Sequence, residues 1–137
     1  MSITNSNQDS LNPKITGIGG IFFKASDTNK TKQWYIDNLG IVPNDWGGVT
    51  FSSRDIDNPE QVNRLEWSLF KNDSDYFAPS TSKYMINYTV QNIEGLIEQF
   101  KANGVTIVDE LAIYEYGKFI HILDNDGNKI ELWEPIN

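Results

Sequence analysis

The amino-acid sequence predicts an α+β fold built from two similar halves, each reading strand, helix, three strands. Stretches rich in β-branched and aromatic residues outnumber the two helical stretches. The two expected helices also end alike, in NLGIV at residues 38–42 and NGVTIV at residues 103–108, with Gly40 and Gly104 as equivalent stops. Because one helix can cover only one face of its sheet, the free faces are expected to curve around a common cleft.

The first half, about residues 14–71, begins with a strand over residues 15–25. Its glycines at 17, 19 and 20 indicate a close approach by another backbone or by a ligand. Ser26 or Asp27 then caps a helix that reaches Asn38. Three further strands are expected, at residues 41–43, 49–53 and 64–70.

A polar segment containing Pro79, about residues 72–82, connects the two halves. The second half, about residues 83–137, opens with a strand at residues 84–90, and Asn92 caps a helix that ends at residue 103. The apolar positions of this helix follow the i, i+3, i+4, i+7 pattern: Ile93, Leu96, Ile97 and Phe100. Strands follow at residues 105–108, 118–123 and 129–134, and Gly127 lies in the turn of the last hairpin.

Composition narrows the class of protein. The 137 residues predict one domain, residues 14–137, after a flexible N-terminal tail at residues 1–13. The absence of cysteine excludes disulfides and thiolate chemistry. The net charge of −8 argues against a nucleic-acid partner, and it leaves cationic small ligands open beside a plain role in solubility. With no signal peptide and no apolar run of about 18 residues, we expect no membrane partner and, by default, a cytoplasmic location.

Three motifs resemble the vicinal oxygen chelate superfamily: IFFKASD…WYIDNLGI, MINYTVQNIEGLIEQFKANGV and DNDGNKIELWEP. That group includes glyoxalase I, extradiol dioxygenases, fosfomycin-resistance transferases and bleomycin-resistance proteins. The likeness covers residues 15–135. It implies two βαβββ modules that form a half-open mixed β-barrel around a central cleft, with the helices outside. It further implies a homodimer and a divalent metal ion in the cleft.

The resemblance also implies where metal ligands belong, on the first and last strands of each module. Carried over one at a time, these positions fall on Gly20, Glu66, Met85 and Glu131. Glycine has no donor and methionine is a poor ligand for hard ions, so the two usual histidines are missing. What remains is a degenerate site in which Glu66 and Glu131 would hold a divalent Zn, Ni, Mn or Fe ion.

His121 is the only histidine, and it lies nearly opposite Glu131 across the last hairpin. It could complete a displaced metal site with Glu66 and Glu131. It could instead form a metal-free catalytic acid/base pair with Glu131. The third interpretation, which we favour, is a histidine that is simply hydrogen-bonded inside a polar pocket.

Strand alternation in phase with the ligand positions turns further side chains toward the cleft. Arg64 would bind a substrate carboxylate or, as we favour, neutralise Glu66. Asn87 is either a ligand contact or a satisfied core amide. Aromatic rings of the YEYG and DYFAP loops are candidates for the rim of the cleft, but Tyr76 and Phe77 could equally fasten the segment that connects the two halves. The predicted ligand-binding residues are Phe22, Arg64, Ser68, Asn87, Tyr114, Tyr116 and Trp133.

These observations favour a protein that binds a small organic molecule in the cleft beside a degenerate metal site, as bleomycin-resistance proteins do. The alternative is a metal-assisted or His121/Glu131 acid–base enzyme of the same superfamily, a lyase, isomerase, thiol transferase or dioxygenase. In either case the predicted partner is a small ligand or substrate, and the sequence does not name it.

Overall fold

The computed structural model describes residues 12–136, so most of the predicted tail at residues 1–13 lies outside the described part. That part contains one seven-stranded mixed sheet, in the order β2-β3-β1-β4-β7-β6-β5, and two helices. The predicted open α+β fold class is confirmed. The elements are β1 (Lys14–Ala25), α2 (Thr28–Leu39), β2 (Val49–Arg54), β3 (Val62–Lys71), β4 (Tyr84–Gln91), α3 (Ile93–Asn103), β5 (Ala112–Tyr114), β6 (Gly117–Leu123) and β7 (Lys129–Pro135).

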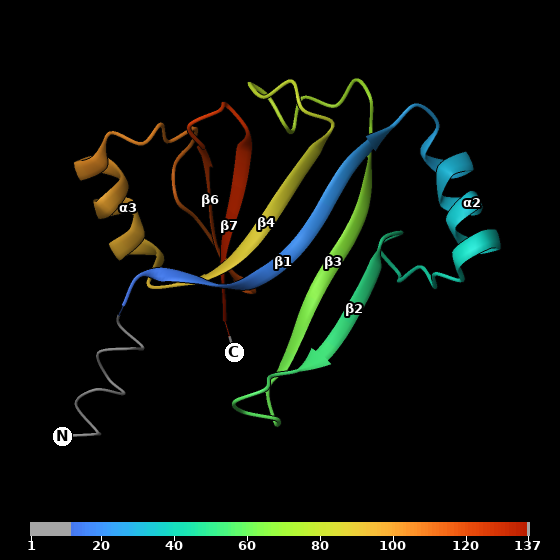
Figure 1. Ribbon diagram of the computed structural model, residues 1–137, viewed down its shortest axis with the longest axis horizontal. Helices are drawn as coiled ribbons and strands as arrows, with labels where there is room; N and C mark the ends of the chain where they lie inside the picture. The colour runs from blue at the N-terminus through green and yellow to red at the C-terminus, as the bar shows by residue number, and fades with distance from the viewer. Residues whose placement is uncertain (1–11, 137) are drawn as a thin grey trace.

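The order and direction of the strands show the internal repeat predicted from the sequence. In each half the first strand pairs in parallel with the last, β1 with β3 and β4 with β7. The halves join through the antiparallel pair β1–β4 at the centre of the sheet. In Figure 1 the two halves of the sheet splay apart from β1 and β4, with α2 beside one half and α3 beside the other. Neither described helix is long and apolar enough to cross a membrane.

Both helices begin and end where the sequence indicates. The side chain of Asp27, rather than that of Ser26, accepts a hydrogen bond from the N–H of Lys30 at 3.0 Å. Asn92 does the same for the N–H of Gly95 at 3.1 Å. Gly40 and Gly104 both adopt left-handed conformations at the C-caps, with φ of 69° and 74°.

The two helices bury very different amounts of apolar surface. Ile93 and Leu96 of α3 join a core cluster with Val90, Ile120 and Leu132. In contrast, no residue of α2 is buried, and this helix contributes aromatic contacts such as Tyr35 against Trp67. The second half therefore has the better-formed hydrophobic core.

Two segments that were expected to be strands do not form regular strands. Residues 41–43 are not a strand, because Pro43 lacks a backbone donor and the neighbouring Val42 is 78% exposed, without a sheet face to cover. Residues 105–108 make only an isolated bridge between Ile107 and Ile122. The chain leaves the edge of β6 at Asp109 and returns as the short strand β5.

Candidate functional site

A single row of paired residues crosses the sheet and carries most of the predicted polar site. Gly20 is paired with Glu66 on one side and with Asn87 on the other. Asn87 is paired with Glu131, and Glu131 with His121. Paired residues in a sheet project their side chains to the same face. The row therefore places Glu66, Asn87, Glu131 and His121 on one common face of the sheet.

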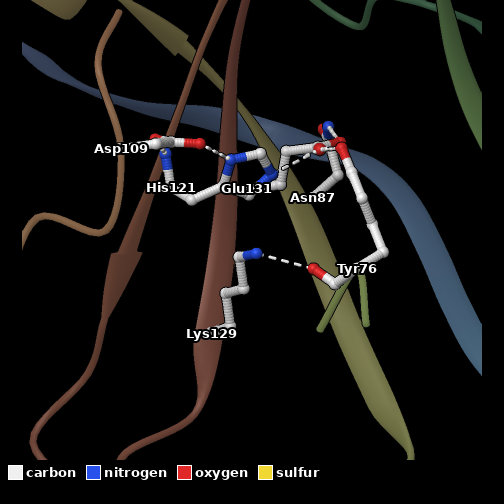
Figure 2. Close-up of polar contacts among 6 residues, drawn as sticks. All are labelled: Tyr76, Asn87, Asp109, His121, Lys129 and Glu131. Atoms are coloured by element: carbon white, nitrogen blue, oxygen red, sulfur yellow. Dashed lines mark hydrogen bonds and ion pairs between the residues drawn. The ribbon is translucent and has the colours of Figure 1, made fainter. Parts of the chain in front are cut away.

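Glu131 is the centre of a polar network, defined here as Tyr76, Asn87, Asp109, His121 and Glu131 (Figure 2). Asn87, His121 and Glu131 are buried, whereas Tyr76 and Asp109 are exposed. The carboxylate of Glu131 accepts hydrogen bonds from three groups. These are the Tyr76 hydroxyl, Asn87 Nδ2 at 2.7 Å and His121 Nε2 at 2.7 Å. Burial raises the pKa of Glu131, but the hydrogen bonds from His121, Tyr76 and Asn87 outweigh it and lower the pKa overall. Glu131 is therefore ionised at neutral pH.

His121 lies between two carboxylates. Its Nδ1 is 2.6 Å from Asp109 Oδ2, and its Nε2 faces Glu131. Because an ionised carboxylate can only accept, this geometry favours a proton on both ring nitrogens, that is, an imidazolium. Burial lowers the pKa of His121, but the hydrogen bonds and charges of Glu131 and Asp109 raise it above its usual value. No ring nitrogen is left to face a ligand.

Asp109 has a second role, at the edge of the sheet. Its Oδ1 accepts the backbone N–H of His121 at 2.8 Å, so a side chain takes the place of a backbone acceptor. The last backbone hydrogen bond between residues 105–108 and β6 runs from the Val108 N–H to the His121 carbonyl. Asp109 follows directly after it. Sequence reasoning missed Asp109, because an acid after a short apolar run has no periodic signal of its own.

Tyr76 was noted as a loop aromatic but not as a site residue, and it joins the connecting segment to the cleft. Its ring stacks on Phe70 at 5.5 Å and meets His121 edge-on at 5.4 Å. Lys129 Nζ donates to the Tyr76 carbonyl at 2.6 Å (Figure 2). Burial and the charge of Glu131 raise the pKa of the Tyr76 hydroxyl, which is thus held as a donor. The neighbouring Phe77 is completely buried.

Glu66 lies in the same row but takes no part in the network. Its carboxylate accepts the Thr50 hydroxyl at 2.8 Å and 3.1 Å, and Thr50 accepts Asn44 Nδ2 at 2.9 Å. Between Glu66 and Asn87 stands Gly20, where an added Cβ would lie 2.7 Å from the Phe22 ring. The structure thus places an aromatic ring where the resemblance implies a ligand side chain.

The donor set does not fit a metal ion. Across residues 12–136, no group of three or more His, Asp or Glu side chains is arranged to hold one. The oxygens of Glu66 and Glu131 and both nitrogens of His121 are bound to other side chains. The atoms that bind a metal ion must be deprotonated and must converge on one point. In this protein the candidate oxygen and nitrogen atoms are instead hydrogen-bonded to other side chains.

A groove of about 960 Å³ lies along the adjacent part of the sheet. It is formed by β1 and β4 in the middle, by the β2–β3 hairpin on one side and by the end of β7 on the other. Its lining includes Thr16, Gly17, Ser53, Asp55, Asn63, Arg64, Thr89, Tyr116, Trp133 and Glu134.

Three of the predicted ligand-binding residues, Arg64, Tyr116 and Trp133, line this groove. Tyr114 stacks on Tyr116 at 5.3 Å with an interplanar angle of 6°. The other three lie elsewhere on the sheet: Phe22 packs on Phe70 at 5.6 Å, Ser68 is paired with Phe22, and Asn87 belongs to the network. Asn87 Oδ1 is buried without a donor from the described residues, so the amide is only half satisfied.

The favoured interpretation of Arg64 as a partner of Glu66 is wrong. The described residues hold no ion pair between the two side chains, since the carboxylate of Glu66 is bound by Thr50 instead. Thr50 is paired directly with Glu66 across β2 and β3, and its hydroxyl binds the Glu66 carboxylate. Arg64 therefore extends into the groove without an internal counter-charge.

The glycines of β1 leave room for side chains of the strands β4 and β7. At Gly19 an added Cβ would lie 2.5 Å from Asn87 Oδ1 and 3.0 Å from the Trp133 ring. At Gly17 it would lie 3.2 Å from the Thr89 hydroxyl. The close approach predicted from these glycines is thus made by side chains of β4 and β7, and Gly17 leaves the floor of the groove bare.

Comparison with known proteins places this geometry in context. The chain matches the model of the Glyoxalase/Bleomycin resistance protein/Dioxygenase superfamily over residues 17–132. The methylmalonyl-CoA epimerase of Mycobacterium tuberculosis is 18% identical, with a TM-score of 0.57 and coverage of 90% of each chain. A Streptomyces coelicolor methylmalonyl-CoA epimerase in complex with 2-nitronate-propionyl-CoA is 15% identical, with a TM-score of 0.63 and coverage of 90% of this chain and 100% of that one.

A superfamily member from Vibrio splendidus 12B01 is 17% identical, with a TM-score of 0.52 and coverage of 90% of this chain and 99% of that one. No curated protein matches the chain. At identities this low, the structural likeness concerns the fold alone.

Proposed function

This chain belongs to the glyoxalase/bleomycin resistance protein/dioxygenase superfamily, and we propose that it binds a small organic molecule in the groove beside its polar network. The observation that carries this proposal is the groove itself, about 960 Å³ in volume. Its size is that of a pocket for a drug-sized ligand, and both halves of the sheet contribute to its walls. Polar side chains and the rings of Trp133 and Tyr116 meet in it, so it offers a ligand both hydrogen bonds and aromatic contacts.

The second part of the proposal is that the metal site has degenerated. In the superfamily a metal ion, where bound, would polarise an oxygen of the substrate. In this chain the imidazolium of His121 lies in the row of the expected ligands and provides the positive charge between Asp109 and Glu131. The network therefore fills the place of the expected metal site beside the groove, and binding is expected to be independent of metal.

An acid–base enzyme is the second candidate, and one contact favours it. A buried imidazole and a buried carboxylate 2.7 Å apart are the groups that transfer protons in many active sites. However, proton transfer to a substrate requires a free nitrogen or oxygen. His121 Nε2 and Nδ1 face Glu131 and Asp109, and Glu131 has three donors. A substrate would have to displace Tyr76 or Asn87 to reach Glu131.

We also propose that the protein forms a homodimer. Several large apolar side chains of the first half stay exposed, among them Leu39, Val42 and Ile56 at 63%, 78% and 92%. A partner subunit would remove the apolar surface of these side chains from water. Sedimentation velocity over a concentration series tests this, and a monomer at every concentration would contradict it.

Binding can be tested with a panel of neutral, cationic and anionic aromatic compounds, followed by tryptophan fluorescence and by thermal unfolding. We expect at least one compound to bind with equal affinity in EDTA and in Zn²⁺, Ni²⁺ or Mn²⁺. Trp133→Leu should weaken that binding at least about tenfold, the loss of one good aromatic contact. The matched control is Trp46→Leu, because Trp46 is 91% exposed and does not line the groove.

Two outcomes would overturn the proposal. One is that no compound of the panel binds, or that Trp133→Leu and Trp46→Leu change affinity equally. The other is tight stoichiometric metal in the purified protein by elemental analysis, which contradicts the degenerate site. For the enzyme candidate, turnover of glyoxal, epoxide or catechol substrates that is lost in His121→Ala would support it over simple binding.

A further inference from the structure

We propose that the ligand of the groove is a planar aromatic compound that carries a carboxylate or a similar anionic group. Arg64 binds the anion, and Trp133 and Tyr116 pack against the aromatic part. This inference rests on the proposed binding function and names the class of ligand for that site. It follows from the charge and the arrangement of the groove lining.

Arg64 is the only cationic side chain among the described residues that line the groove. Within residues 12–136 its guanidinium has no hydrogen-bond or ion-pair partner. The other arginine of the chain, Arg54, is in contrast bound to the Pro59 carbonyl at 2.9 Å. A guanidinium matches a carboxylate with two parallel hydrogen bonds, so Arg64 is a preformed anion contact.

The two acids of the groove lining are already hydrogen-bonded within the chain. Asp55 accepts from Asn63 Nδ2 at 3.2 Å and from the backbone N–H groups of Asp57 and Asn58 at 2.9 Å and 3.1 Å. Glu134 accepts the backbone N–H of Ile93 at 2.7 Å. These hydrogen bonds occupy the two carboxylates without cancelling their charge, so the charged group of the groove lining that is left to contact a ligand is the guanidinium of Arg64. A ligand with an anionic group fits this contact.

The aromatic side of the groove is held in place before any ligand arrives. The Trp133 ring stacks on Phe119 at 5.8 Å with an interplanar angle of 5°, and its Nε1 donates to the Tyr116 carbonyl at 3.3 Å. Tyr116 stacks on Tyr114, yet it remains 61% exposed. Rings that are already ordered lose little conformational entropy when a planar ligand packs on them.

The sheet sets the distance between the two contacts. Arg64 comes two residues before Glu66 on β3, and Trp133 two residues after Glu131 on β7. Because β3 and β7 run antiparallel, both residues lie on the same side of the row that contains Gly20, although the register of β1 and β4 shifts between Ile18 and Gly20. Three strand spacings of about 4.8 Å each separate β3 from β7 along the sheet, about 14 Å at most across the strands. The long side chain of Arg64 covers part of this distance. A bicyclic ring system, or a single ring with a short acidic side chain, covers the rest.

Three naphthalene probes whose polar groups are anionic, neutral and cationic test the inference: 2-naphthoate, 2-naphthamide and 2-naphthylmethylammonium. Affinities are measured by calorimetry on the full chain. We expect 2-naphthoate to bind at least about tenfold more tightly than the other two, the value of one charge-assisted pair. Arg64→Gln should remove that preference and leave the affinity for 2-naphthamide unchanged. Arg54→Gln, on the adjacent strand β2, is the matched control and should have no effect.

Thermal unfolding shows whether each variant is folded. Equal affinities for the three probes, or an unchanged preference in Arg64→Gln, would overturn the assignment of an anionic ligand while the binding function stands. If none of the three probes binds but a compound of the wider panel does, the proposed ligand class is wrong and the groove is still a binding site. A panel without any binder removes the proposed function as well.

Discussion

The imidazole of His121 and the carboxylate of Glu131 face each other across the β6–β7 pair, with Nε2 2.7 Å from Oε2. Each group is bound again on its far side, His121 by Asp109 and Glu131 by Tyr76 and Asn87. A site that would suit acid–base catalysis or metal binding is thus filled by internal partners. The groove that we propose as the ligand site lies beside this network.

We predict that stability is greatest in mildly acidic solution. The pKa of His121 is raised by folding, so its contribution is complete below the usual value of 6.5 and is lost as the pH rises through the folded value. The pKa of Glu131 is lowered, so its contribution is complete above the usual 4.5 and is lost as the pH falls through the folded value. Urea unfolding from pH 3 to pH 9 measures this.

His121→Gln should remove the decline above pH 6.5, which can be assigned because His121 is the only histidine. A wild-type free energy of unfolding that stays level between pH 6 and pH 9 would contradict the imidazolium.

Removing the charge of Glu131 should be costly. In Glu131→Gln the buried imidazolium loses one of its two counter-charges, and we expect a loss of about 3–5 kcal/mol in the free energy of unfolding, as for other broken buried ion pairs. Glu66→Gln serves as the control, since Glu66 is hydrogen-bonded to Thr50 alone. Equal effects of the two substitutions in denaturant titrations would show that the network contributes no special stability.

The Tyr76 hydroxyl should hold the connecting segment over the sheet. Tyr76→Phe removes one hydrogen bond to a charged acceptor, with an expected loss of about 1.5–3 kcal/mol and faster proteolysis within residues 72–82. The control is Tyr84→Phe, because Tyr84 is 57% exposed and its ring stacks on Phe23. Limited proteolysis of the two variants side by side distinguishes a fastened segment from a loose one.

Filling the floor of the groove should block the ligand without unfolding the protein. A Cβ at Gly17 meets only the Thr89 hydroxyl, at 3.2 Å, so Gly17→Val adds a branched side chain in the groove. We expect the affinity for the best probe to fall at least about tenfold while the melting temperature changes little. At Gly19, substitution collides with Asn87 and the Trp133 ring, and there we expect destabilisation instead. Unchanged affinity in Gly17→Val would place the ligand elsewhere.

Divalent metal should not stabilise the protein. Metal that binds the native state raises the melting temperature with its concentration, and here every expected donor is already hydrogen-bonded. Differential scanning fluorimetry with Zn²⁺, Ni²⁺, Mn²⁺ and EDTA checks this. A rise that saturates at stoichiometric metal and disappears in Glu131→Gln would contradict it.

The sequence alone determined the architecture and most of the row of candidate residues. It placed Met85 at one ligand position, whereas the strand register places Asn87 there and pairs Met85 with Phe22. The ends of both helices followed from Asp27, Asn92 and the two C-cap glycines, because caps are local and depend on a few neighbouring residues. Glu131 and His121 could be named because a lone acid and a lone histidine stand out in apolar strands. Their shared face followed from the two-residue period of a strand.

The tertiary structure alone decided the partners. Asp109 reaches His121 because the edge of β6 is left open, and Tyr76 reaches Glu131 because the connecting segment folds back over the sheet. Arg64 lost its expected partner for the same kind of reason, since Thr50 of the neighbouring strand binds Glu66 first. Such contacts join residues far apart in the chain, and no local pattern encodes them. Which donor meets which acceptor is set by the packing of the strands and the path of the loops.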